Sequence, residues 1–152
     1  MRAIGIDFGE RRIGVAVSDS GGVLAVGRGT VQRSGDIAAD HAALARVVEE
    51  TGAERAVVGL PLSLDGSHGP AAQKVAAEAA TLEAALGVPV ELYDERFTTV
   101  TASRSLAGAG MRSRAQRRVV DEAAATVLLQ SWLDGRSGHR ARASSEPGTE
   151  RR

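Results

Sequence analysis

The sequence predicts a mixed α/β fold with one five-stranded sheet covered by helices on both faces. Apolar or alternating segments at 2–8, 12–18 and about 23–31 follow one another through short turns, which favours three antiparallel strands. Two further apolar segments, at 55–60 and 88–93, are separated by helical patterns. Such crossovers favour parallel pairing of the later strands.

Helical spacing of apolar residues and capping signals predict the helices. They cover about 36–52, 70–87, 98–107 and 116–134. Asp36 or Ser34 is the expected N-cap of the first, and Pro70 lies in the first turn of the second. Met111–Ala115 is expected to be a mobile basic loop.

Composition predicts one domain over 1–134 and a disordered tail over 135–152, where Arg, Ser, Gly and Glu dominate. Cysteine is absent, which excludes disulfides and thiolate metal sites. No run approaches the roughly 18 apolar residues of a membrane span, so we expect a soluble cytoplasmic protein.

Three acidic residues are candidates for a shared cation site. Asp7 ends the first strand, Glu95 follows the fifth strand, and Asp121 heads the apolar face of the last helix. Each has an ordinary explanation when taken alone: a turn aspartate, an ion pair with Arg96, and an acid near a helix N-terminus. Together they form an all-oxygen donor set, which favours magnesium or manganese over zinc.

Other chemistry has little support in the sequence. No serine and histidine pair suits nucleophilic catalysis, so metal-activated water remains. The window 96–120 contains six arginines and no acidic residue, which is typical of either a phosphate-facing surface or a solvated face. Asp7-Phe-Gly9 also resembles a phosphate loop of the actin and sugar-kinase ATPases, but those proteins resemble a doubled and much longer version of this architecture.

Four stretches, in order, resemble the YqgF family of pre-16S rRNA nucleases, also called RuvX-type Holliday junction resolvases, across Met1–Asp134. The stretches are Ile6-Asp-Phe-Gly9 with Arg12-Ile-Gly-Val-Ala-Val-Ser-Asp19; Val58-Gly-Leu-Pro-Leu62 with Asp65-Gly66 and Gly69-Pro70; Asp94-Glu-Arg-Phe-Thr-Thr-Val100; and Val120-Asp121. The resemblance implies an RNase H-like fold and a magnesium-dependent nuclease, with manganese as a substitute.

The resemblance also implies roles for particular residues. Asp7, Glu95 and Asp121 would be the catalytic acids and the metal ligands. Contacts to nucleic acid would come from Arg11, Arg12, Arg96, Thr98, Arg117 and Arg118. Glu10 departs from the family pattern by adding a negative charge beside the expected cation, and Glu122 follows Asp121 where a small residue is common.

Three functions remain open at this point. The leading one is hydrolysis of phosphodiester bonds in pre-16S rRNA during ribosome maturation, by a monomer or weak homodimer. The alternatives are Holliday junction cleavage, which requires a dimer for symmetric cuts, and a non-catalytic ribosome-assembly factor that binds nucleic acid. The three carboxylates oppose the last alternative, because a binder would gain affinity for phosphate by losing them.

Overall fold

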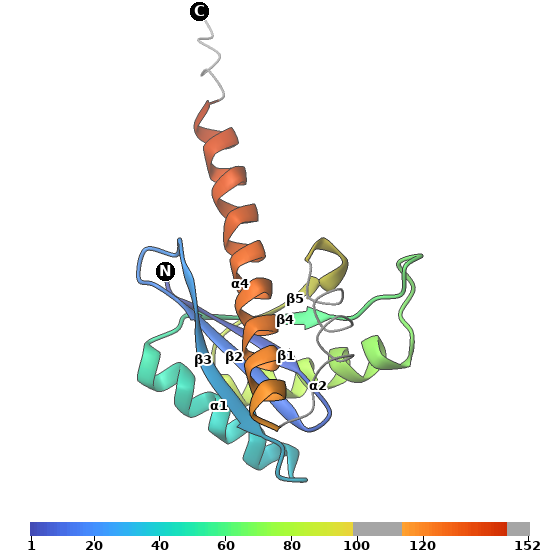
Figure 1. Ribbon diagram of the computed structural model, residues 1–152. Helices are drawn as coiled ribbons and strands as arrows, with labels where there is room; N and C mark the ends of the chain where they lie inside the picture. The colour runs from blue at the N-terminus through green and yellow to red at the C-terminus, as the bar shows by residue number, and fades with distance from the viewer. Residues whose placement is uncertain (99–113, 146–152) are drawn as a thin grey trace, which may run out of the picture.

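A computed structural model describes residues 1–98 and 114–145, with side chains described over 1–98 and 117–136. Its centre is one five-stranded sheet in the order β3-β2-β1-β4-β5 (Figure 1). The strands are β1 (Ala3–Phe8), β2 (Arg12–Ser18), β3 (Ala25–Gln32), β4 (Arg55–Leu60) and β5 (Val90–Asp94). β1, β2 and β3 pair antiparallel, whereas β4 pairs parallel with β1 and with β5. The predicted mixed sheet is confirmed.

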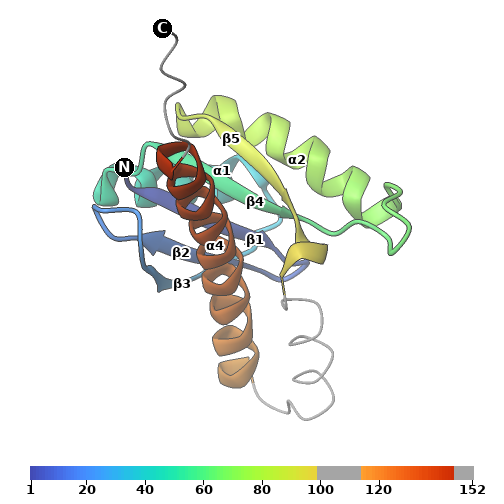
Figure 2. The ribbon, with the colours of Figure 1, turned by 90° about the horizontal axis from the view of Figure 1, so that it is seen from above.

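Helices cover both faces of the sheet, as predicted. α1 (Ile37–Thr51) and α2 (Pro70–Leu86) lie on one face, and α4 (Arg114–Ser145) lies across the other (Figures 1 and 2). A short 3-10 turn, η1 (Glu95–Phe97), follows β5. The helix predicted from Thr98 or Thr99 to Ala107 lies outside the described residues apart from Thr98. Most of the predicted basic loop lies there too, although Arg114 and Ala115 belong to α4.

The alternation of strand residues divides the interior into two cores. Ile4 and Ile6 of β1 face α1 and α2, where they pack with Leu44 and Leu82. Ala3, which precedes Ile4, faces α4 and belongs to the second core, whose residues are Ala3, Ala16, Ala25, Val57, Ala125, Leu129, Trp132 and Leu133. Odd-numbered positions of β1 therefore point toward α4.

α4 does not end at Asp134 as predicted but continues to Ser145. The polar composition beyond Gly135 predicts a disordered tail, yet the residues that follow include Arg and Ala, which favour helices, and no proline interrupts them up to Ser145. Residues 146–152 lie outside the described residues, so a disordered end stays a prediction. No helix in the described ranges is long and apolar enough to cross a membrane.

Among the described side chains of α4 the last buried one is Leu133, and beyond it the helix leaves the sheet (Figure 1). Deleting residues from Gly138 onward should therefore change the melting temperature by no more than about 2 °C, because the removed sequence contains no large aliphatic residue. Differential scanning calorimetry of the full and shortened chains would check this. A clearly lower melting temperature would mean that the removed segment packs on the domain.

A polar network on the α1 and α2 side holds the turn between β1 and β2. Arg33 donates two hydrogen bonds to the Glu78 carboxylate, at 2.7 and 2.9 Å, and a third to the Gly9 carbonyl oxygen at 3.0 Å. Its guanidinium also lies 5.2 Å from the centre of the Phe8 ring. The buried His41 places Nε2 3.0 Å from Glu78 Oε2. This network fixes the chain that immediately follows Asp7.

Replacing Arg33→Gln should lower the free energy of unfolding by about 2 to 3 kcal/mol, because a buried carboxylate loses its cation. Burial raises the pKa of Glu78, but hydrogen bonds from Arg33 and His41 outweigh it and hold the pKa below its usual value. The stabilisation that the ionised Glu78 carboxylate gives the folded protein is therefore present above the ordinary carboxyl pKa and is lost as the pH falls. Urea unfolding at about pH 7 and about pH 3 should show the difference between the two proteins shrinking at acid pH. An equal difference at both would contradict this.

Candidate active site

Asp7 is a buried acid near the end of the central strand. It occupies β1, is 2% exposed, and lies on the α4 face with the other odd-numbered positions. Its cross-strand partner on β2 is Gly14. On the other side, β1 and β4 pair in register up to Ile6 and Val58, so the next position of β4 beside Asp7 is Gly59. Asp7 is thus flanked on both sides by glycines, which lack a Cβ atom and so allow other groups to approach the sheet closely.

Glu95 lies above one of these glycines. A Cβ atom added to Gly59 would meet the Glu95 carboxylate at 2.6 Å, so the side chain covers that position. Glu95 is 5% exposed, and burial, followed by the charge of Asp94, raises its pKa. This placement agrees with the expectation that Asp7 and Glu95 share one edge of the sheet, since Asp7 lies beside Gly59 and the Glu95 side chain lies over Gly59.

Asp121 lies above the other glycine. Its carbonyl oxygen and carbonyl carbon would clash with a Cβ atom at Gly14, which brings the backbone of α4 against β2. The carboxylate accepts a hydrogen bond from Arg12, with 3.1 Å between Nε and Oδ2. Arg12 begins β2 and is itself buried, on the same face as Gly14. The third predicted acid therefore lies at the site and is held by an arginine.

The donor set fits a divalent cation. Asp7 and Glu95 are buried carboxylates on one face, and burial disfavours their charged forms unless a cation compensates them. All the donors are oxygens, which magnesium and manganese prefer. Within the ranges with described side chains, however, no group of three or more acids, histidines or cysteines is arranged to hold a metal ion. The Asp121 carboxylate points toward Arg12, and it would have to turn away from Arg12 to hold one ion together with Asp7 and Glu95.

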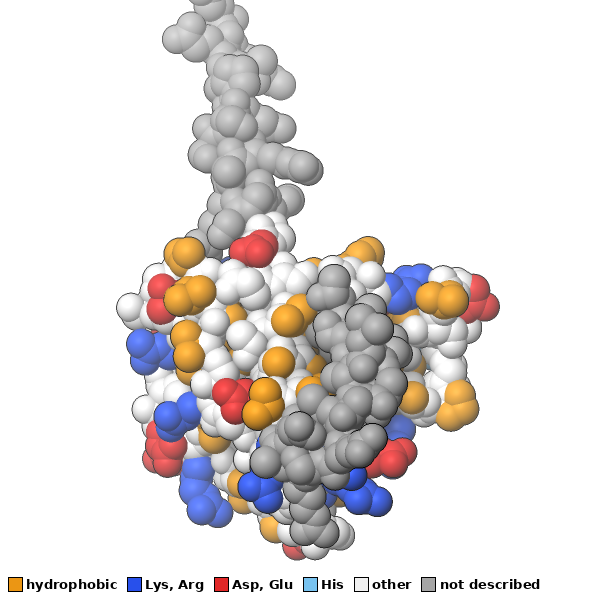
Figure 3. All heavy atoms as spheres, in the orientation of Figure 1, with side chains coloured by type: hydrophobic (Ala, Val, Ile, Leu, Met, Phe, Trp, Pro, Cys, Tyr) orange, Lys and Arg blue, Asp and Glu red, His pale blue; other side chains and the backbone are white. Residues whose placement is uncertain are grey.

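The predicted nucleic-acid contacts fall into two groups. Arg11, Arg117 and Arg118 are exposed, and several Lys and Arg side chains gather along the lower edge in Figure 3, the edge where α4 begins in Figure 1. Arg12 and Arg96 are engaged within the protein. The Arg96 guanidinium donates to both oxygens of Asp94, from Nε at 3.1 and 3.0 Å, and these bonds lower the pKa of Asp94.

Thr98 has a local role in the structure. Its hydroxyl group donates to the Glu95 carbonyl oxygen at 2.8 Å, and its backbone N–H donates to the same oxygen at 3.0 Å. These two bonds close η1 and fix the backbone that carries the Glu95 carboxylate. Whether Thr98 also contacts nucleic acid stays a prediction.

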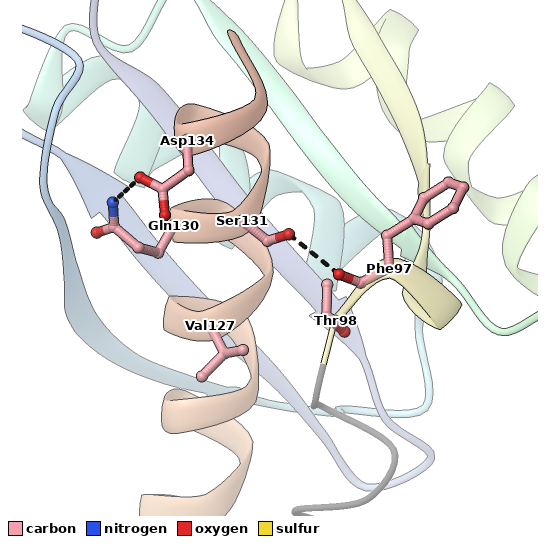
Figure 4. Close-up of a pocket in the computed structure, with 6 residues that line it drawn as sticks. All are labelled: Phe97, Thr98, Val127, Gln130, Ser131 and Asp134. Carbon is pink, nitrogen blue, oxygen red and sulfur yellow. Dashed lines mark hydrogen bonds between the residues drawn. The ribbon is translucent and has the colours of Figure 1, made fainter. Parts of the chain in front are cut away.

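A pocket of about 340 Å³ opens beside this turn, between η1 and α4. It is lined by Phe97, Thr98, Val127, Gln130, Ser131 and Asp134. Figure 4 shows the Phe97 ring pointing away from α4, while its carbonyl oxygen accepts a hydrogen bond from the Ser131 hydroxyl at 3.4 Å. No sequence pattern indicates this pocket, because its lining residues come from η1 and α4, which meet only in the tertiary fold.

Known structures support the fold class. The chain is similar to Thermus thermophilus RuvC, solved in complex with a Holliday junction substrate, with a TM-score of 0.53, 21% identity, and coverage of 91% of this chain and 97% of that chain. Thermus thermophilus RuvC alone also gives a TM-score of 0.53, at 20% identity. With its mixed sheet covered by helices on both faces, the chain has the RNase H-like fold.

The family follows from sequence comparison. The model of the RuvX family, described as Holliday junction resolvase, matches residues 1–135, and this chain belongs to that family. A protein of Anaeromyxobacter dehalogenans named "Putative pre-16S rRNA nuclease" is 49% identical over 139 residues, covering 90% of this chain and 99% of that protein. Proteins of the same name from Myxococcus xanthus and Moorella thermoacetica are each 48% identical over 134 residues. The resemblance inferred from the four sequence stretches is confirmed.

Proposed function

We propose that this chain is a magnesium-dependent nuclease that hydrolyses phosphodiester bonds in pre-16S rRNA, with manganese as a substitute ion. The observation that carries the proposal is the pair of buried carboxylates: Asp7 in β1, and Glu95, whose side chain lies over Gly59 of the neighbouring strand β4. Burying a carboxylate is costly, and a divalent cation makes a cluster of buried carboxylates favourable. The names of the relatives support rRNA as the substrate.

In this mechanism Asp7, Glu95 and Asp121 would hold the ion. When bound there, a divalent cation would supply an activated water and charge stabilisation for the leaving oxygen of the phosphodiester. Gly14 and Gly59 let the backbone of Asp121 and the carboxylate of Glu95, respectively, lie close against the strands. Arg11, Arg117 and Arg118 are exposed cations, which suits contact with the backbone phosphates.

Cleavage of four-way DNA junctions is the second candidate. The description of the RuvX family and the junction-bound RuvC structure favour it. The two candidates differ in assembly, because symmetric cleavage of a junction requires two active sites, whereas one domain is sufficient to cut RNA. We place rRNA first on the basis of the relatives. The cytoplasm, where ribosomal precursors mature, is the location that this function requires.

The test is to size the products that the purified protein makes from end-labelled precursor rRNA and from a synthetic four-way junction. We expect magnesium-dependent RNA fragments with 5′-phosphate and 3′-hydroxyl ends, and none when a chelator is present. Cleavage of the junction alone would favour the alternative function. Binding without cleavage of either substrate would overturn the nuclease proposal in favour of an assembly factor.

A further inference from the structure

The ion pair between Arg12 and Asp121 has an unusual position. Arg12 is only 7% exposed and Asp121 is 21% exposed, and the pair joins the start of β2 to the first part of α4. Both residues lie on the sheet face that carries Asp7 and Glu95. An arginine side chain in this location brings a permanent positive charge into the region where the proposed function requires a divalent cation.

We propose that Arg12 is the counter-ion of Asp121 in the metal-free protein and that a bound divalent cation displaces it. The inference rests on the proposed function, because it takes Asp121 as a metal ligand. A carboxylate has enough lone pairs for two partners, but a guanidinium and a divalent cation on the same carboxylate repel each other, and at a site only partly open to water this repulsion is incompletely screened. The two cations therefore compete for Asp121.

This competition means that Arg12 controls how readily Asp121 can bind a metal ion. Only the fraction of molecules with Asp121 released can complete the site, so the pair weakens the apparent affinity for metal. In the metal-free protein the same pair compensates the charge of Asp121 and holds α4 over Gly14. Once displaced, the Arg12 guanidinium would be available for a substrate phosphate, so the predicted phosphate contact of Arg12 would depend on bound metal. Arg12 is in this sense a positioning residue of the site.

The first test measures Mn²⁺ binding to the full chain by isothermal titration calorimetry. Arg12→Gln should bind Mn²⁺ about tenfold more tightly than the wild type, which corresponds to about 1.4 kcal/mol. Arg28→Gln is the matched control, because Arg28 pairs with Glu50 of α1 at 2.9 Å, away from the acidic site, and its affinity should equal that of the wild type. Unchanged or weaker binding by Arg12→Gln would overturn the inference.

A second test uses the wild-type protein, so it does not depend on the folding of a variant. The Nε–H signal of Arg12 in ¹⁵N-labelled protein should shift when Mg²⁺ is added and should return when a chelator is added. If Mg²⁺ saturates the protein while this signal stays unchanged, the displacement is wrong and the proposed metal site stands. If the wild type binds neither Mg²⁺ nor Mn²⁺, the metal-dependent function itself fails and this inference with it.

Discussion

Asp7→Asn should reduce magnesium-dependent cleavage of precursor rRNA by about a thousandfold or more, because losing about 4 kcal/mol of metal-derived stabilisation has that effect on a rate. Asparagine keeps the shape of the side chain but replaces a charged oxygen donor with a neutral amide. Because Asp7 is only 2% exposed, water cannot take the place of the lost charged ligand. Single-turnover cleavage assays at saturating magnesium would measure the loss.

The variant should keep its fold, because an amide is easier to bury than a charged carboxylate. Its circular dichroism spectrum should match that of the wild type. Asp36→Asn is a suitable control, since Asp36 is an exposed N-cap of α1 and asparagine caps helices equally well. The control should cleave at the wild-type rate. If Asp7→Asn also cleaved at that rate, Asp7 would not be part of the catalytic site.

Local rules were sufficient to predict most of the fold from the sequence. The hairpin between β1 and β2 follows from two alternating segments and a short turn, and Gly9 closes it with a 3.0 Å hydrogen bond to Arg12. The parallel pairing of β4 and β5 follows from the intervening helix α2. Because parallel strand ends meet at one edge, the proximity of Asp7 and Glu95 could also be predicted.

The partners within the site could not be predicted in this way. Arg12 and Asp121 are 109 positions apart, and Arg33 reaches Glu78 across 45 positions. No periodicity within one segment specifies such contacts, which depend on how α4 and α2 pack on the sheet. The family resemblance implied that Arg12 contacts nucleic acid, whereas its burial and its bond to Asp121 appear only in the structure.

The glycines of the strands are a signal that sequence reasoning could have used. Glycine weakens a strand unless another backbone comes close to it. Gly5, Gly14 and Gly27 all lie under α4, where an added Cβ atom would meet Leu129, Asp121 and Glu122 respectively. Three glycines on neighbouring strands therefore indicate a closely packed helix. The same close approach brings Asp121 to the candidate active site.

Gly14→Ala should consequently destabilise the protein strongly, by about 3 kcal/mol, the upper part of the usual range for overpacking. The new methyl group would meet the carbonyl group of Asp121, which is backbone and cannot rotate away as a side chain could. α4 would have to move off β2, weakening the contacts of Ala125 and Leu129 with the second core. Urea unfolding monitored by the fluorescence of Trp132, which lies on α4, would report both the stability and the displacement.

Gly135→Ala provides the matched control, because it makes the same chemical change in α4 where nothing lies within 4 Å of the added Cβ atom. Alanine favours helix over glycine by about 0.8 to 1 kcal/mol, so this variant should be as stable as the wild type or more so. A loss of stability in Gly14→Ala but not in Gly135→Ala would show that the effect comes from steric contact at β2 and not from alanine in general. If Gly14→Ala were as stable as Gly135→Ala, α4 would not rest directly on β2. The position of Asp121 beside Arg12 would then have to be reconsidered.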